Sequence, residues 1–232
     1  MHDKHEAAGL AIFAKAPLPG EVKTRLFPHL TPEDTTQLHR VFVLDTLTRL
    51  KTLRDIRRYI ACYPSLTHPF FQQLSQDFKI ELLDQQGDDL GQRMGGIVKT
   101  LMQNGCSRVV LIGTDIPTLP TSYVKDAFNF LQRRAPQTEV VLGPSEDGGY
   151  YLIGLSHWVP QLFEGIPWST DKVFELTLQK IHDLDLKFEI LPQWFDVDDY
   201  KHLKTLAAQL AQQPDLAPHT WAFLKNHPVK CS

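Results

Sequence analysis

The feature that most constrains the fold is an alternation of short apolar runs with longer helix-like segments along the chain. Seven runs have the length and composition of buried strands, namely 9–14, 59–63, 80–84, 108–113, 139–143, 150–155 and 188–191. Helices are expected between them, at 32–53, 69–76, 90–103, 120–134, 170–182 and 200–212. Strands that alternate with helices form a mostly parallel sheet with helices on both faces. The sequence therefore predicts an α/β protein.

Local signals agree with this order of elements. Thr31 followed by Pro32 is a typical helix start, because threonine caps the first turn and proline fits its first position. The run at 109–113 is apolar throughout, as a central strand should be. No repeat or low-complexity tract divides the chain, and the only linker-like stretch, 212–218, precedes an expected short C-terminal tail. We therefore expect one domain over residues 1–232.

Composition excludes several classes of function. A formal net charge of −3 argues against broad nucleic-acid binding. No run approaches the roughly 20 apolar residues that cross a bilayer. The polar N-terminus lacks the apolar centre of a signal peptide, so we expect a cytoplasmic protein without a membrane span. The widely spaced Cys62, Cys106 and Cys231 form neither a disulfide framework nor a zinc pattern, and the first two are expected to be buried.

The loop after the first strand carries the first candidate site. Ligands of open α/β sheets bind beyond the carboxyl ends of the strands. Proline and glycine stiffen the first half of this loop, and its second half is Lys23-Thr24-Arg25. Lysine and arginine both suit phosphate, although neither of the common glycine-rich phosphate motifs is present. A solvated basic turn is the alternative, but the position after the first strand favours phosphate binding.

The second candidate is Asp115, which follows the most apolar strand. A buried carboxylate is costly unless it is paired or binds a metal ion. Mg²⁺ needs few protein carboxylates, because water and phosphate oxygens complete its shell. Asp115 could instead cap the next helix, but Pro120 gives that helix its own later start. We therefore expect Asp115 to bind a metal ion.

Two further loops carry clustered acids. In the loop after the fifth strand, Glu146 and Asp147 precede Gly148 and Gly149, which is consistent with a plain hairpin or with a site whose glycines let a ligand approach. The stretch 194–200 contains three acids, Asp196, Asp198 and Asp199. One of them could cap the last long helix. Because clustered carboxylates repel one another, a second metal contact from Asp196 or Asp198 is the functional interpretation.

Two weaker segments complete the set. The glycine-bearing stretch 85–94, with Gly87 and Asp89, is expected to touch the base or ribose of a nucleotide. The stretch 166–170 is expected to end in a helix cap at Ser169 or Thr170, with Trp168 in the core or in an acceptor pocket.

Taken together, these segments resemble a known bacterial family. FAKAPLPGEVKTRL, GDDLGQRM, GTDIPTL, GPSEDGGYYLIGL, IPWST and FDVDD occur in the order typical of the transferases associated with radical-SAM and selenodomain proteins, which are usually labelled glycosyltransferases. The resemblance spans about Leu10 to Leu203. It implies the GT-A fold of the nucleotide-diphospho-sugar transferase superfamily, a Rossmann-like sandwich with a mostly parallel central sheet.

The resemblance also implies roles for particular residues. A nucleotide would be cradled by the loop after the first strand, through Lys15, Gly20, Lys23, Thr24 and Arg25. Asp115 would hold a divalent ion, Mg²⁺ or Mn²⁺, and the Asp-Val-Asp segment maps a second metal contact best to Asp198. Glycosyltransferases of this fold carry Asp-x-Asp at the metal position, whereas here the first place is Gly113. A lone aspartate resembles the nucleotidyltransferase branch, which includes molybdenum-cofactor and phospholactate guanylyltransferases.

Three functions follow from these expectations. The first is glycosyl transfer from a nucleotide-sugar donor to a small-molecule acceptor near Glu146, Asp147, Gly148, Gly149 and Trp168. Lys23 and Arg25 would stabilise developing phosphate charge, and Asp147 would act as the base. The second is nucleotidyl transfer with release of pyrophosphate, and the third is a non-catalytic nucleotide-binding module. The sequence leaves the donor base, the acceptor and the oligomeric state open.

Overall fold

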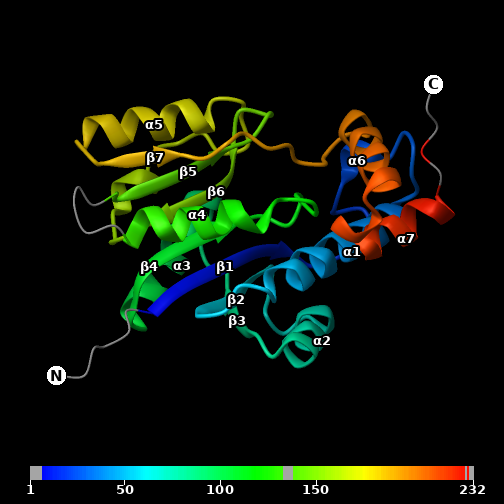
Figure 1. Ribbon diagram of the computed structural model, residues 1–232, viewed down its shortest axis with the longest axis horizontal. Helices are drawn as coiled ribbons and strands as arrows, with labels where there is room; N and C mark the ends of the chain where they lie inside the picture. The colour runs from blue at the N-terminus through cyan, green and yellow to red at the C-terminus, as the bar shows by residue number, and fades with distance from the viewer. Residues whose placement is uncertain (1–6, 133–137, 228, 230–232) are drawn as a thin grey trace.

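Seven strands form one sheet in the order β3-β2-β1-β4-β6-β5-β7 (Figure 1). The computed structural model describes residues 7–132, 138–227 and 229. The strands are β1 (Ala7–Lys15), β2 (Ile56–Tyr63), β3 (Glu81–Asp84), β4 (Cys106–Ile112), β5 (Val140–Pro144), β6 (Tyr150–Leu155) and β7 (Phe188–Ile190). Strand β6 runs antiparallel to both of its neighbours, and the other pairs are parallel. The predicted fold class is confirmed, and every predicted strand is present.

The helices cover both faces of this sheet. They are α1 (Pro32–Leu50), α2 (Pro69–Phe78), α3 (Leu90–Gln103), α4 (Thr121–Gln132), α5 (Val173–Asp183), α6 (Tyr200–Gln212) and α7 (Pro218–Asn226). Alternate residues of β1 point to opposite faces, so Leu10 and Ile12 pack under α1, α2 and α4, while Ala11 packs under α3 and α5. The predicted central position of β4 agrees with its two neighbours, β1 and β6.

A third apolar cluster lies beyond the carboxyl end of the sheet, where Figure 1 shows α6 and α7 beside α1. The outer face of α1 packs there against both helices. Leu26, from the short 3-10 helix η1 (Thr24–Leu26) in the loop after β1, and Val197, from the stretch after β7, are fully buried in the same cluster. Because one apolar cluster holds both segments, the loop after β1 and the stretch after β7 are fixed next to each other.

Two sequence predictions need correction. The expected C-terminal tail is instead η3 (Pro214–Leu216) followed by helix α7. Neither Ser169 nor Thr170 caps α5, because the helix begins only at Val173 and has no side-chain cap. The Thr170 hydroxyl donates to the Pro167 carbonyl instead. Cys62 and Cys106 are buried, as expected, while Cys231 lies outside the described residues.

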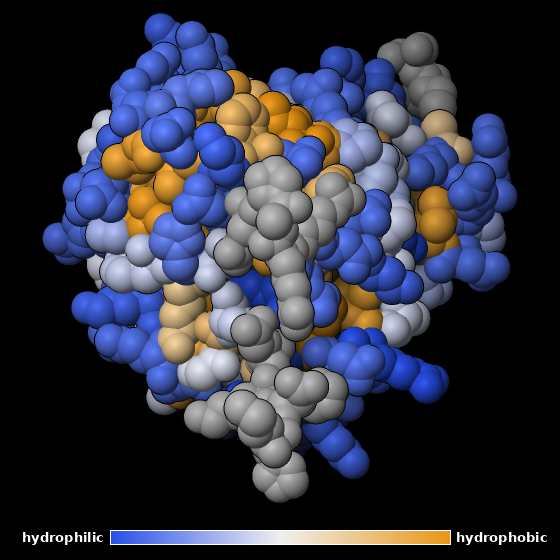
Figure 2. Space-filling model, turned by 60° about the vertical axis from the view of Figure 1, so that its left-hand side comes forward, coloured by the Kyte–Doolittle hydropathy of each residue, from blue (hydrophilic) through white to orange (hydrophobic). Residues whose placement is uncertain are grey.

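The surface carries few large apolar side chains. Of the residues that the structure describes, the exposed large hydrophobic ones are Phe27, Leu90, Leu184 and Ile190. Figure 2, which brings the left-hand side of Figure 1 forward, shows hydrophilic residues over most of that face, with separate hydrophobic patches between them. Within the described ranges no helix combines the length and apolar character needed to cross a membrane.

Candidate active site

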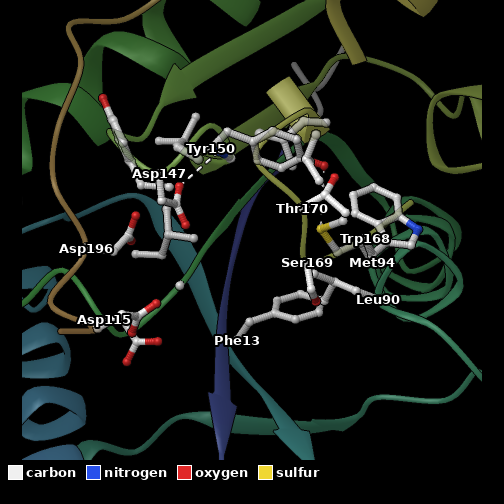
Figure 3. A pocket seen from close by; sticks show the side chains of 18 of the residues that line it. Phe13, Leu90, Met94, Asp115, Asp147, Tyr150, Trp168, Ser169, Thr170 and Asp196 are labelled. Carbon is white, nitrogen blue, oxygen red and sulfur yellow. Dashed lines mark hydrogen bonds between the residues drawn. The ribbon is translucent and has the colours of Figure 1, made fainter. Parts of the chain in front are cut away.

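A cavity of about 670 Å³ lies at the carboxyl edge of the sheet (Figure 3). Five segments far apart in the sequence contribute to its wall: η1 and the residue before it, the loop after β4, the β5–β6 hairpin, the segment before α5 and the stretch after β7. Parallel strands deliver these loops to one edge, as expected for this class of sheet. The cavity therefore brings together most of the loops that the sequence singles out.

Lys23 is the central cation of this site. Its Nζ lies 2.6 Å from Asp115 Oδ1 and 2.8 Å from Asp198 Oδ1, and it donates a hydrogen bond of 2.8 Å to the Val197 carbonyl. The side chain is 3% exposed. Burial lowers the pKa of Lys23, but the two carboxylates outweigh it, so the pKa lies above its ordinary value and the amine is charged. Lys23 thus joins three segments of the cavity wall.

Backbone contacts fix the acids around Lys23. The Val197 N–H donates to the Asp115 carbonyl at 2.9 Å, which joins the loop after β4 to the stretch after β7. Lys23 itself has a φ of 52°, the left-handed conformation, so the loop turns sharply where its side chain enters the cavity. Lys23 holds the pKa of Asp198 below its ordinary value. The charged groups are therefore held by backbone as well as by side-chain contacts.

His39 on α1 is a neighbour of this group that the sequence did not indicate. Its Nε2 lies 2.9 Å from the Lys15 carbonyl, an acceptor, so Nε2 carries the hydrogen. Its Nδ1 lies 3.9 Å from Asp115 Oδ1. Burial lowers the pKa of His39, which keeps the ring neutral at pH 7. His39 therefore fixes the start of the cationic loop without adding a charge.

Asp196 carries the most perturbed carboxyl group in this part of the cavity. Burial raises its pKa to about 8, with further contributions from Asp147, Asp115 and Asp198. The Ser145 hydroxyl donates to Asp196 Oδ2, and Asp147 Oδ1 accepts the Gly149 N–H at 2.9 Å. The carboxylates that the sequence placed in separate loops thus influence one another in space.

Replacing Asp196 with Asn is expected to flatten the pH dependence of stability. The folded protein keeps a proton on Asp196 up to a pKa of about 8, whereas the unfolded chain releases it near the ordinary 3.8. This contribution to stability is complete below the unfolded pKa and is lost as pH rises to about 8, at no more than about 1.4 kcal/mol per pH unit. For the parent protein, the free energy of unfolding measured with urea in EDTA should be about 1–2 kcal/mol lower at pH 7.5 than at pH 5.5. Asp196→Asn should lack this difference. Asp171→Asn, at an exposed acid of the same cavity, should keep the drop, and equal behaviour of both variants would contradict this origin.

The predicted site residues divide into two sets. Those that line the cavity are Lys23, Thr24, Arg25, Asp115, Asp147, Gly149, Trp168 and Asp198. Those that are not part of its wall are Lys15, Gly20, Gly87, Asp89, Glu146 and Gly148.

The contacts of the second set explain their positions. Lys15 donates to the Glu21 carbonyl at 2.8 Å, and Asp89 caps α3 by accepting the Gln92 N–H at 2.8 Å. Glu146 pairs with His202 at 3.4 Å. Gly148 packs directly on the Asp171 backbone with a φ of +87°, so its glycine serves the hairpin conformation. Since β5 and β6 are antiparallel neighbours, the hairpin interpretation of this loop is confirmed, while its contact with a ligand stays a prediction.

Other residues of the cavity were not named as site residues by sequence reasoning, although Leu90 and Met94 lie in the stretch 85–94 that was expected to touch the nucleotide. They are mainly apolar and come from β1, α3 and β6, with Asp171 as a further acid: Phe13, Leu90, Met94, Tyr150 and Asp171. The apolar members of this set carry only an apolar or amphipathic sequence pattern, and core residues carry the same pattern.

The charges of the cavity fit a divalent cation. Because Asp196 keeps its proton up to a pKa of about 8, two cations, Lys23 and Arg25, face four other acids, which gives a formal charge of 2 − 4 = −2; these acids are Asp115, Asp147, Asp171 and Asp198. No three His, Cys, Asp or Glu side chains among the described residues are arranged as a metal site. Mg²⁺ needs only one or two carboxylates when water and phosphate supply the rest. Asp115 and Asp198 are the pair that would hold it.

Comparison with solved structures supports the fold and identifies a relative. A protein from Desulfovibrio desulfuricans G20, provisionally described as a nucleotide-diphospho-sugar transferase, is 33% identical over 94% of each chain, with a TM-score of 0.85. CMP:2-keto-3-deoxy-manno-octonic acid synthetase, solved with CTP, is 13% identical over 89% of this chain and 99% of its own, with a TM-score of 0.58. A cytidylyltransferase from Leptospira borgpetersenii serovar Hardjo-bovis (strain JB197) is 16% identical over 92% and 97%, with a TM-score of 0.56. The last two likenesses concern the fold alone.

Comparison with protein families adds a direct assignment. The family described as "Uncharacterized protein conserved in bacteria (DUF2064)" matches residues 46–170. A comparison with curated proteins gave no match. The association with radical-SAM proteins implied by the sequence stays a prediction. The chain belongs to the DUF2064 family and has the fold of the nucleotide-diphospho-sugar transferases.

Proposed function

We propose that this protein is a divalent-metal-dependent transferase that moves a sugar from a nucleotide-diphospho-sugar to a small-molecule acceptor. One observation carries the proposal: Lys23, Arg25, Asp115 and Asp198, from three loops at the carboxyl edge, line a single cavity. The description of the 33% identical relative as a nucleotide-diphospho-sugar transferase supports the donor class. The negative cavity also explains the need for a metal, because an anionic donor entering alone would be repelled.

In the proposed reaction an acceptor oxygen attacks the anomeric carbon of the donor sugar. The bond between that carbon and the phosphate oxygen breaks, and nucleoside diphosphate leaves with the electron pair. Asp147, on the β5–β6 hairpin at the cavity, takes the proton of the acceptor. Lys23 and Arg25 stabilise the charge that develops on the leaving phosphate. A divalent ion on Asp115 and Asp198 would neutralise part of the same charge.

Nucleotidyl transfer is a second candidate. It is favoured by where the two acids come from. Asp115 has Gly113, not a second aspartate, two residues before it, and the other acid that contacts Lys23, Asp198, belongs to a different loop. In that reaction the acceptor oxygen attacks the α-phosphorus, the bond between the α- and β-phosphates breaks, and pyrophosphate leaves. The same cations would stabilise that leaving group. The product therefore distinguishes the two reactions.

A thermal-shift panel of nucleoside triphosphates and nucleotide-diphospho-sugars, each with and without Mg²⁺, tests the proposal. A donor at about 100 times its Kd is expected to raise Tm by about 5–10 °C with Mg²⁺. Ligands that stabilise are then assayed for released nucleoside diphosphate or pyrophosphate. Stabilisation by triphosphates alone would replace glycosyl with nucleotidyl transfer. Binding without turnover of any donor would favour a non-catalytic module.

Asp115→Asn is expected to remove most of the Mg²⁺-dependent part of that Tm shift, because it deletes a carboxylate that would hold the ion. The matched control is Asp126→Asn, which changes an exposed acid on α4 outside the cavity wall. This control should keep the full Mg²⁺ increment. A full increment in Asp115→Asn would show that the metal binds elsewhere.

A further inference from the structure

The cavity has two chemically different ends. Figure 3 shows Asp115, Asp147 and Asp196 on one side and Leu90, Met94 and Trp168 on the other. Phe13 lies with the second group, and the Tyr150 side chain lies between the two. The acidic end, with Lys23 and Arg25, accounts for phosphate and metal in the proposed function. The other set of five, Phe13, Leu90, Met94, Tyr150 and Trp168, is called the apolar end below.

Packing fixes the apolar end in place. The Trp168 indole rests on the backbone of α3 at Gly91, where an added Cβ would lie 2.5 Å from Nε1. Only glycine allows this approach, and it places Trp168 beside the turn of α3 that carries Leu90 and Met94. The Tyr150 hydroxyl donates to Met94 Sδ at 3.9 Å, and burial raises the pKa of Tyr150. These contacts make a preformed wall of the kind that binds small molecules.

Leu90 gives independent evidence for a ligand here. It is 39% exposed and is one of four large hydrophobic side chains that are exposed in the described ranges. Of these four, only Leu90 is part of the cavity wall. A single exposed leucine is ordinary, but one placed beside an aromatic wall extends the apolar surface into the cavity.

Polar partners are scarce at the apolar end. The Thr170 hydroxyl already donates to the Pro167 carbonyl at 2.9 Å, and the Tyr150 hydroxyl donates to Met94. Ser169, which Figure 3 shows beside Leu90, adds one further hydroxyl to this part of the wall. A nucleobase or an unmodified sugar carries several polar groups, each of which costs free energy when buried without a partner. An aromatic or branched hydrocarbon group has no such cost. The position also suits an acceptor, because Tyr150 follows Asp147, the proposed base, on the same hairpin.

We propose that the acceptor carries an apolar group, an aromatic ring or a hydrocarbon of similar width, that binds at the apolar end. This inference rests on the proposed transferase function and specifies the class of its acceptor. The apolar group lies between Leu90, Met94 and Trp168, and the acceptor hydroxyl faces Asp147. An acceptor with an apolar group is then preferred over a polar one, because a hydroxyl group buried against this wall without a partner costs binding free energy.

Benzyl alcohol is the probe, and the readout is the indole N–H signal of Trp168 in ¹H–¹⁵N NMR spectra of the full chain. Benzyl alcohol is expected to shift this signal saturably, whereas glycerol at the same concentration should not. Leu90→Gln should raise the Kd of benzyl alcohol by about fivefold, since it removes part of the apolar contact. Leu184→Gln is the matched control, because Leu184 is 37% exposed and lies outside the cavity wall.

A second measurement separates acceptor from donor. The titration is repeated with the protein saturated by Mg²⁺ and the nucleotide that gives the largest Tm shift. An unchanged Kd of benzyl alcohol, with nucleotide affinity equal in Leu90→Gln and the parent, supports the acceptor assignment. Competition between the two ligands, an unshifted Trp168 signal, or equal effects of the two leucine variants would overturn it. A parent protein that binds benzyl alcohol at Trp168 but no nucleotide would instead refute the transferase proposal, and with it the acceptor role.

Discussion

Replacing Lys23 with Met is expected to weaken Mg²⁺-dependent nucleotide binding by about 100-fold, or about 2.7 kcal/mol. Lys23 is the buried cation that both acids of the proposed metal pair contact, at 2.6 and 2.8 Å. Methionine keeps the apolar stem near Phe42, over whose ring Nζ lies at 5.3 Å, but removes the charge. Hydrogen bonds to charged groups contribute about 1.5–3 kcal/mol each. Isothermal titration with the nucleotide selected by the thermal-shift panel measures the loss.

Lys15→Met is the matched control, because Lys15 ends the strand that leads into the loop of Lys23 and both lysines were predicted to bind the nucleotide. Lys15 is 38% exposed, pairs with Glu21 at 3.6 Å, and is not part of the cavity wall. Its replacement should change affinity less than twofold, since exposed ion pairs contribute about 0–1 kcal/mol. Equal losses in the two variants would mean that the phosphates bind outside the cavity, and an unaffected Lys23→Met would remove Lys23 from the site.

The order of strands and helices was predictable because it depends on local patterns. Val109 to Gly113 is apolar at every position, and Val109 to Ile112 form the buried C-terminal half of β4. The six predicted helices are all present; α3 and α6 have the predicted bounds, and the others begin or end within three residues of them, except that the predicted end at residue 134 lies outside the described residues. Helix α5 is an example, since it was expected from residue 170 but begins at Val173, after a left-handed residue at Ser169 with a φ of 68°. Local patterns therefore predicted the presence of each element more accurately than its first and last residues.

The candidate site was predictable where chemistry follows a strand in the sequence, as with Lys23, Asp115 and Asp198. It was not predictable where a residue reaches the site from the middle of a helix or strand. His39 on α1 and Phe13 on β1 occupy positions whose sequence pattern is that of ordinary core residues. Asp89, a polar residue before a helix that was assigned to the ligand, caps α3 and is not part of the cavity wall. Only the packing of distant elements distinguishes these cases.

Helix α7 was missed because the contact that starts it comes from elsewhere in the chain. Its N-cap position, Ala217, offers no side-chain acceptor. The fully buried carboxylate of Asp45, on α1, accepts the N–H groups of His219 at 3.0 Å and Thr220 at 2.7 Å. A cap supplied across 174 residues of sequence leaves no local signal. Asp45 therefore does for α7 what an N-cap side chain does for other helices, because it accepts hydrogen bonds from N–H groups of the first turn.

Asp45→Ala is accordingly expected to lower the free energy of unfolding by about 3 kcal/mol. It leaves the buried N–H group of Thr220 and the part-buried N–H group of His219 without their acceptor, and a buried group in this state costs about 1–3 kcal/mol. It also removes the carboxylate that acts against the burial-induced fall in the pKa of Arg49, whose guanidinium donates to the Leu216 and Leu119 carbonyls. Urea unfolding gives the difference, and Tm should fall by about 6–12 °C.

Asp89→Ala is the control for the effect of burial on the cost of losing a cap, because Asp89 also caps a helix, α3, but from an exposed position. Its loss should be about 1 kcal/mol, the usual value for a solvated cap, since water replaces the missing acceptor. Asp45→Asn should fall between the two, because the amide oxygen can still accept one of the two N–H groups. If Asp45→Ala and Asp89→Ala lost the same stability, the apolar contacts of Phe223 and Leu224 would suffice to hold α7 against α1, and the buried carboxylate would contribute no more than an exposed one.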